Sequence, residues 1–238
     1  MSQLQGKVAL VTGAGSGVGR AVSVALAREG AAVGLMGRRL GPLEQCAHLV
    51  REAGGQAVVL PADVSDEHAV VAMLEQLAES CGGIDILINS AGVGIYGPVE
   101  SYTLDDWRLT IDTNLTGVFL CSRYVLPYMR ERGSGCIITL SSGAGRKGVA
   151  NLGAYAASKF AVIGFMESLA EEVGQYGIKC STIIPGSVLT DFGPEALADK
   201  RLQTDRKFLE PDDVAEAIVN LLRQPGKAWT QELHLWPF

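Results

Sequence analysis

The fold of this chain is decided at residues 8–19, VALVTGAGSGVG, where a short apolar run leads directly into a glycine-rich loop. The run is apolar throughout, as a strand buried on both faces requires. Glycines in the loop permit a tight turn and a close approach of the main chain to a pyrophosphate, which would face the N-terminus of a helix expected to begin at Gly17. Between a first strand and a first helix, this pattern predicts dinucleotide binding.

Beyond this stretch, apolar runs rich in valine and isoleucine alternate with segments of helical period, which predicts βαβ units around a parallel sheet. We expect strands at 8–11, 32–36, 57–60, 84–88, 136–140, 179–184 and 232–235, and helices at 17–28, 43–53, 67–80, 106–130, 154–176 and 212–223. The expected fold class is α/β, with a doubly wound, mostly parallel seven-stranded sheet, helices on both faces and a single domain over residues 1–238. The irregular connection at 187–208 is expected to be a lid over the substrate, with a disordered piece as the alternative.

Composition excludes several function classes. The 238 residues include 29 glycines and are 47% hydrophobic, which suits a compact fold with many turns. A net charge of −6 and the lack of any long basic run argue against nucleic-acid binding. No apolar run approaches the roughly 18 residues of a spanning helix, so no membrane role is expected. The five cysteines are scattered and the three histidines share no ligand spacing, which predicts reduced thiols and no metal site. With no room for a signal peptide before the first strand, the expected location is the cytoplasm.

The end of the second expected strand bears on the choice of cofactor. A chain that binds NAD(H) usually carries an acidic residue there, which accepts from the ribose 2′-hydroxyl. Here the strand ends at Arg38 and Arg39, and the nearest carboxylate is Glu44, inside the next expected helix. Two guanidinium groups complement a 2′-phosphate, so Arg38, aided by Arg39, predicts NADP(H) rather than NAD(H). The alternative is a solvated pair of arginines beside a turn.

A second informative stretch lies at residues 142–159. Tyr155 and Lys159 are four residues apart, which places both side chains on one face of a helix. A phenol with a pKa of about 10 is a poor base at neutral pH, and a neighbouring positive charge lowers that pKa. Ser142, at the end of an apolar run, adds a hydroxyl donor. Taken alone, the tyrosine and lysine spacing is more often found on an ordinary surface helix.

Together these motifs resemble the classical short-chain dehydrogenases/reductases over essentially the whole chain. The shared features, in chain order, are the T-G-x-x-x-G-x-G loop at 12–19, Asp63 after the third strand, Asn89-Ser90-Ala91-Gly92 after the fourth, Asn114, Ser142, Tyr155, Lys159, and Pro185-Gly186 after the sixth. The family usually shows N-N-A-G where Ser90 stands here. The resemblance implies a Rossmann fold and hydride transfer between NADP(H) and a small carbonyl compound or secondary alcohol.

The resemblance also implies a role for each matching residue. Tyr155 would be the general acid/base, Lys159 would stabilise the phenolate and bind the nicotinamide ribose, and Ser142 would hold the substrate oxygen. Asn114 would anchor a water that relays protons, with a packed helix-face amide as the alternative. The expected cofactor contacts are Gly13, Gly15, Ser16, Gly17, Val18, Gly19, Arg38, Arg39, Asp63, Val64, Asn89, Ala91, Gly92, Tyr155, Lys159, Pro185, Gly186, Val188 and Thr190. Asp63 has a turn or helix cap as its alternative role, and Thr190 that of an ordinary lid residue.

The loops after the strands should form the walls of the substrate pocket, at residues 94–97, 144–151 and 187–208. They are mostly apolar, which favours a neutral or mildly polar carbonyl compound, although Arg146 and Lys147 keep an acidic substrate open. Tyr96 either lines this pocket or packs elsewhere.

The resemblance implies a homotetramer or homodimer built on the helices at 106–130 and 154–176, with the aromatic tail at 233–238 able to reach a neighbouring subunit. Two other functions remain open. A 3-oxoacyl-carrier-protein reductase would need a basic surface for its acidic carrier. A non-catalytic NADPH-binding regulator would have no need of Asn114, Ser142, Tyr155 and Lys159 together.

Overall fold

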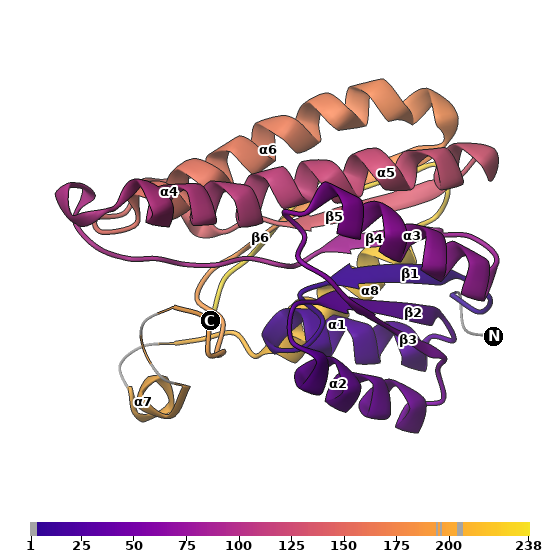
Figure 1. Ribbon diagram of the computed structural model, residues 1–238, viewed down its shortest axis with the longest axis horizontal. Coiled ribbons are helices and arrows are strands. Elements are labelled where there is room, and N and C mark those ends of the chain that lie inside the picture. Colours follow the sequence, from indigo (N-terminus) through magenta and orange to yellow (C-terminus); the bar gives the residue numbers. More distant parts are fainter. Residues whose placement is uncertain (1–3, 194, 196, 204–206) are drawn as a thin grey trace.

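Seven parallel strands form one sheet at the centre of the molecule (Figure 1). The computed structural model describes residues 4–193, 195, 197–203 and 207–238. The strands are β1 Val8–Thr12, β2 Ala32–Gly37, β3 Ala57–Pro61, β4 Ile86–Asn89, β5 Gly135–Leu140, β6 Ile178–Pro185 and β7 Glu232–Leu235. Their order is β3-β2-β1-β4-β5-β6-β7, and each neighbouring pair is parallel. The predicted doubly wound sheet is confirmed, and it is parallel throughout rather than mostly parallel.

Helices cover both faces of the sheet. They are α1 Gly17–Arg28, α2 Leu40–Glu52, α3 Glu67–Cys81, α4 Leu104–Ile111, α5 Gly117–Glu131, α6 Gly153–Val173, α7 Leu197–Leu202 and α8 Pro211–Leu222. Helices α1, α2 and α8 pack on one face, and α3, α5 and α6 pack on the other (Figure 1). Successive residues of β1 point to opposite faces, so Val11 lies in the first core and Leu10 in the second, both fully buried. This double burial explains why the opening strand is apolar at every position.

The predicted continuous helix at 106–130 is wrong in two respects. It begins earlier, at Leu104, because the side chains of Thr103 and Asp106 cap it reciprocally. A π-helical segment, Asp112–Thr116, then separates α4 from α5. Such wider turns occur mostly as single interruptions of α-helices, often at functional sites. Here the wider turn contains Asn114, which is fully buried.

Two other boundaries differ from the expected ones. Helix α2 begins three residues before the expected position because Pro42 lies in its first turn, where a proline removes no intrahelical hydrogen bond. Helix α7 lies within the 187–208 connection, which was expected to be irregular.

The order of strands reverses between β1 and β4, and in open α/β sheets the ligand crevice lies at the carboxyl ends of the strands at such a point. The opposite end of these strands is tied by Asp85, whose carboxylate accepts from Lys7 Nζ at 3.0 Å, Arg132 Nη1 at 3.2 Å and the main-chain N–H of Val8 at 2.9 Å. In the described part of the chain, no helix combines the length and the apolar character that a membrane span requires.

Candidate active site

The glycine-rich loop packs tightly between β1 and the loop after β4. Gly13 has φ 68°, and a Cβ there would lie 2.9 Å from Ala91 Cα. A Cβ on Gly19 would lie 2.4 Å from the carbonyl oxygen of Gly13. Ser16 precedes α1, and its side chain makes no capping hydrogen bond, so it leaves the N–H groups of the first helical turn available to an anion.

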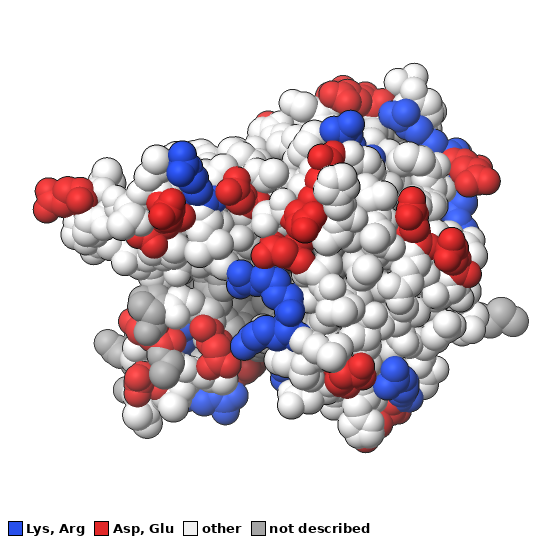
Figure 2. Space-filling view, in the orientation of Figure 1, with Lys and Arg blue, Asp and Glu red and all other residues white. Residues whose placement is uncertain are grey.

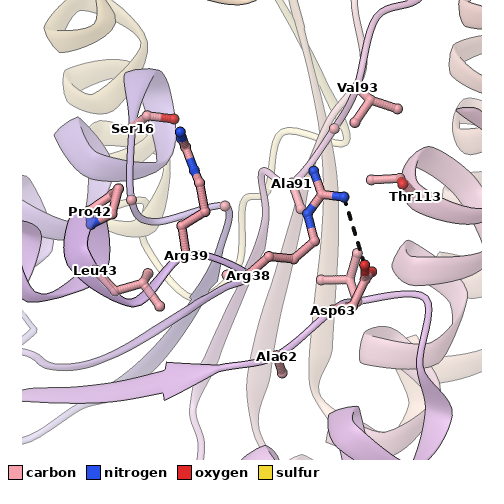
Figure 3. Close-up of a pocket in the computed structure, with 15 residues that line it drawn as sticks. Ser16, Arg38, Arg39, Pro42, Leu43, Ala62, Asp63, Ala91, Val93 and Thr113 are labelled. Atoms are coloured by element: carbon pink, nitrogen blue, oxygen red, sulfur yellow. Dashed lines mark ion pairs between the residues drawn. The ribbon is translucent and has the colours of Figure 1, made fainter. Parts of the chain in front are cut away.

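Beside this loop is a cavity of about 150 Å³ (Figure 3). It is lined by Gly13, Gly15, Ser16, Gly37, Arg38, Arg39, Pro42, Leu43, Ala62, Asp63, Val64, Ala91, Gly92, Val93 and Thr113. Arg39 reaches toward Ser16, whereas Arg38 extends to the other side, toward Asp63 (Figure 3). Figure 2 shows Lys and Arg side chains gathered beside a hollow in the middle of the molecular face drawn there. The cavity thus joins a main-chain anion site to two cations.

Asp63 serves the turn that was its alternative role and also lines the cavity. Its Oδ1 accepts from the main-chain N–H of Ser65 at 3.0 Å and from the Ser65 hydroxyl at 2.8 Å. Its Oδ2 lies 3.9 Å from Arg38 Nη1, and both side chains are partly exposed. The cap of α3 is Asp66, whose side chain accepts from the N–H of Ala69.

Asn89 ends β4, and its side chain is buried. Its side chain points into the interior, where Nδ2 donates to Ser122 Oγ at 3.2 Å and to Thr139 Oγ1 at 3.1 Å. Because the residue is 2% exposed, its side chain supports the crevice from below. Thr12, to which the sequence reasoning gave no role of its own, has Oγ1 accepting from the N–H groups of Ser90 and Ala91, each at 3.0 Å. Thr12 is the last residue of β1, and this place at the carboxyl end of the strand was the sequence signal for a role in the crevice.

Ser142, Tyr155 and Lys159 come together beside the carboxyl end of β5. The side chain of Ser142 accepts from the main-chain N–H of Ala144, while Tyr155 and Lys159 lie on the buried face of α6. Lys159 Nζ donates to the carbonyl oxygen of Leu140 at 2.7 Å and lies 5.8 Å from the centre of the Tyr155 ring. A Cβ on Gly92 would lie 4.0 Å from the same Nζ, so the ammonium group also faces the loop after β4.

The electrostatics of this group differ from the simple sequence argument. Burial raises the pKa of Tyr155, and a side-chain hydrogen bond with Ser142 opposes that shift. Burial also lowers the pKa of Lys159 from 10.5 to about 8. Without a bound cofactor or substrate, burial of the phenol therefore outweighs any lowering of the Tyr155 pKa by the Lys159 charge. The phenol is protonated at neutral pH.

Asn114 connects the π-helical segment to two other parts of the site. Its Oδ1 accepts from the N–H of Val93 at 2.8 Å, and its Nδ2 donates to the Val93 carbonyl at 2.9 Å and to Ser158 Oγ at 3.0 Å. The amide thereby fastens the loop after β4 to α6.

A comparison with protein families can now be set beside this geometry. The model of the short chain dehydrogenase family matches residues 7–201. The chain belongs to this family. A glycine betaine reductase of Emericella nidulans is 37% identical over 98% of the chain, which spans 19% of that longer protein. An uncharacterized oxidoreductase of Staphylococcus aureus, SAR2567, is 36% identical over the full length of both proteins.

Solved structures give the same result. A short chain dehydrogenase from Burkholderia cenocepacia in complex with NADP superposes with a TM-score of 0.89 and 32% identity, over 99% of this chain and 97% of that one. A 3-ketoacyl-ACP reductase from Sinorhizobium meliloti superposes with a TM-score of 0.87 and 34% identity, over 96% of each chain. The resemblance that the sequence motifs predicted is confirmed, and the protein is an oxidoreductase of the short-chain dehydrogenase family with the Rossmann fold.

In this dehydrogenase the segment after β6 returns toward the glycine-rich loop. Gly186 N–H donates to the Leu235 carbonyl at 2.7 Å, and Val188 pairs with Leu209 in an isolated bridge. Thr190 packs on the start of α1, since a Cβ on Gly17 would lie 3.2 Å from its methyl carbon. Pro185, the last residue of β6, is buried.

The basic residue expected near the pocket is already paired. Arg146 Nη2 forms ion pairs with Glu232 and, at 3.5 Å, with Glu167. Arg146 is thereby engaged, whereas Lys147 is exposed. In the tail, Trp236 packs within its own subunit, because a Cβ on Gly143 or Gly186 would lie 2.7 or 2.8 Å from its ring. Trp236 is nevertheless 60% exposed, and Phe238, the last residue, is fully exposed.

Proposed function

We propose that this short-chain dehydrogenase transfers a hydride between NADP(H) and a small carbonyl compound or secondary alcohol, with Tyr155 as the general acid/base. The observation that carries the proposal is the convergence of Ser142, Tyr155 and Lys159 on one side of the crevice at the strand reversal. The cavity with Arg38 and Arg39 lies on the other side. A reacting group and a nucleotide site thus share one crevice.

The residues present fit the cofactor. Gly13 and Gly19 allow the tight main-chain turn, since a Cβ at either would collide with Ala91 or with the Gly13 carbonyl oxygen. The N–H groups at the start of α1 suit a pyrophosphate, and Lys159 is near enough to bind a ribose. Ala91, Gly92 and Val64 would flank the bound nucleotide. Thr190 and Val188, with Gly186, would close over the nicotinamide. When bound, the nicotinamide supplies the hydride in reduction and accepts it in oxidation.

Tyr155 donates its phenolic proton to the carbonyl oxygen in reduction and removes the hydroxyl proton in the reverse direction. Because its pKa is raised by burial, the phenol is protonated and ready to act as an acid at neutral pH. Lys159, with a pKa of about 8, still carries its charge there and stabilises the phenolate that forms. Ser142 donates a hydrogen bond to the substrate oxygen.

Tyr155→Phe removes only the acid/base hydroxyl, so we expect turnover to fall by a factor of about 10² to 10⁴. Binding of NADPH, followed by fluorescence, should stay within about twofold of the wild type. The matched control is Tyr176→Phe, which changes a half-exposed ring at the end of α6 and should leave turnover unchanged. A Tyr155→Phe enzyme as active as the control would rule out the assigned role.

We propose that Arg38 and Arg39 favour NADP(H), because a charge-assisted hydrogen bond to the 2′-phosphate is absent with NAD(H). In Arg38→Ala the ratio of kcat/KM for NADPH to that for NADH should fall about 10- to 100-fold. Arg51→Ala, an exposed arginine in the last turn of α2, is the control. A wild-type preference for NADH that survives Arg38→Ala would refute the proposal.

A second candidate is 3-oxoacyl-carrier-protein reduction, which the similarity to the Sinorhizobium meliloti reductase favours. Turnover of an acyl thioester would establish it. The non-catalytic regulator is disfavoured, because a binder has no need of Asn114, Ser142, Tyr155 and Lys159 together; Asn114 keeps its proposed role of anchoring a water that relays protons. Absence of turnover across a broad carbonyl and alcohol panel, with tight NADPH binding, would revive it.

For the assembly, we propose a homotetramer or homodimer on the outer faces of α5 and α6, which lie side by side (Figure 1). Val118, Val125, Val162 and Leu169 pack inward, whereas Phe119 and Phe160 are 39% and 47% exposed. Light scattering that shows a monomer at micromolar concentration would contradict this. The cytoplasm stays the proposed location, and the five free cysteines suit its reducing conditions.

A further inference from the structure

Two aromatic rings from different loops close on the Tyr155 ring. Tyr96, from the loop after β4, meets it edge-on with ring centres 6.0 Å apart, and Phe192, from the connection after β6, meets it at 5.7 Å. Both rings reach the space above Gly94, where a Cβ would lie 2.8 Å from Tyr96 and 2.9 Å from Phe192. We call Tyr96 and Phe192 the aromatic clamp.

The clamp is held in place from behind. Lys200, on α7, is 7% exposed, and its Nζ donates to the carbonyl oxygens of Thr190 at 2.7 Å and Phe192 at 2.6 Å. A Cβ on Gly193 would lie 3.0 Å from the Tyr96 ring, so the connection also rests on Tyr96 itself. The main chain on both sides of Phe192 is therefore anchored, and its ring is directed at Tyr155.

A small apolar cluster lies against the clamp. Ala144, Tyr155 and Ala156 form a buried cluster, and Tyr96 and Leu152 pack against it. Burial raises the pKa of the Tyr96 phenol, so the phenol is neutral at physiological pH. Arg146 is engaged with Glu232 and Glu167, and the buried amines of Lys159 and Lys200 donate to main-chain carbonyls. A substrate group that enters here leaves water for aromatic faces.

We infer that the aromatic clamp selects carbonyl substrates that carry a flat apolar ring, seated between Tyr96 and Phe192 with the carbonyl oxygen at Tyr155. This inference rests on the proposed function. The Phe192 ring lies in contact with Tyr155. In our proposal the substrate ring takes this position, and Phe192 moves aside and covers the substrate ring. Aromatic ring pairs contribute to binding beyond the apolar area that they bury. A linear alkyl chain of equal size lacks this additional contribution.

The test compares two neutral, unconjugated methyl ketones of equal carbon number, benzylacetone and 2-decanone, with NADPH. The wild type should show a kcat/KM for benzylacetone about three- to tenfold above that for 2-decanone. Phe192→Leu and Tyr96→Leu keep an apolar side chain but lose the ring, so each should lower this ratio about threefold or more. Phe192→Tyr keeps the ring and should retain the ratio.

Phe119→Leu, which removes a half-exposed ring on α5, is the matched control and should leave the ratio unchanged. Melting temperature and NADPH affinity of each variant show that it is folded. Equal efficiency with both ketones in the wild type, or a ratio that Phe192→Leu and Tyr96→Leu leave intact, overturns the clamp alone. Failure of the wild type to reduce either ketone or any other carbonyl compound overturns the proposed function, and the clamp with it.

Discussion

At the scale of single residues, the least expected property is the environment of Lys159. The residue is 5% exposed, and its ammonium group donates to the carbonyl of Leu140. The unfolded chain leaves this amine in water, so folding removes a charge from its preferred solvent. The position is thus costly for stability, and its retention fits the role proposed for it at the cofactor.

This cost predicts a pH-dependent effect of Lys159→Met. The pKa of Lys159 is about 8 in the folded state and 10.5 in the unfolded state. Between these pH values the unfolded chain binds more protons than the folded chain, so the stability of the wild type rises with pH. At pH 7 the variant should therefore be more stable than the wild type by about 1–3 kcal/mol, with the unpaired Leu140 carbonyl reducing the gain.

The measurement is urea unfolding at pH 7 and near pH 10, with Lys227→Met, an exposed lysine, as the control. The difference between wild type and Lys159→Met should shrink toward pH 10, since the wild-type amine is then neutral in the folded state. A difference that is the same at both pH values would show that the effect comes from packing and not from the charge.

At the scale of elements, the glycine-rich loop is a contact between main chains. Gly13, Gly19 and Ala91 lie so close that side chains have no place between them, and Thr12 fastens the loop after β4 to the end of β1. The same arrangement brings the N-terminus of α1 to the crevice. The loop is therefore a structural unit as well as the proposed pyrophosphate site.

Gly19→Ala should consequently destabilise the protein by about 1–3 kcal/mol and weaken NADPH binding, because its Cβ would lie 2.4 Å from the Gly13 carbonyl oxygen. Gly41→Ala is the matched control in the first turn of α2, where a Cβ meets no atom within 4 Å in the described part of the chain. The control should be neutral or slightly stabilising. Denaturant unfolding and NADPH titration measure both effects, and equal behaviour of the two variants would contradict the argument.

At the scale of the whole molecule, one end of the central strands has a structural role and the other end carries the proposed active site. One end is tied by Asp85 to Lys7, Arg132 and the main chain of β1, which joins the first strand, the fourth strand and the segment after α5. The other end opens into the crevice that holds the proposed site. The charged group at the closed end should therefore affect stability without affecting catalysis.

Asp85→Asn tests this division. Loss of the buried carboxylate, which is 4% exposed, leaves two cations without their partner, and we expect the free energy of unfolding to fall by about 1–3 kcal/mol. The kcat of the folded enzyme should be unchanged. Asp105→Asn is the control, since its pair with Arg108 is exposed and should be worth less than about 1 kcal/mol. A loss of kcat in Asp85→Asn at full folding would show that the two ends are coupled.

Much of the fold was predictable from local pattern. In a βαβ series, apolar runs such as 8–11 indicate buried strands, and the glycines at 13–19 indicate a tight turn between strand and helix. The spacing of Tyr155 and Lys159 places both on one helix face by helical geometry alone. The π-helical segment around Asn114 was missed because the local sequence is compatible with a regular helix. The wider turn is seen only where the amide bonds to Val93 and Ser158, which distant elements contribute.

The sequence by itself determined the parallel sheet and the glycine-rich turn, because these follow from periodicity and short spacings, and its motifs carried the resemblance to the family. Only the tertiary structure decided what surrounds Tyr155. Tyr96 and Phe192 come from loops after two different strands, and they meet because the carboxyl ends of parallel strands share one edge. The same packing removes water from Lys159 and Tyr155 and so sets the direction of their pKa shifts, which no local pattern records.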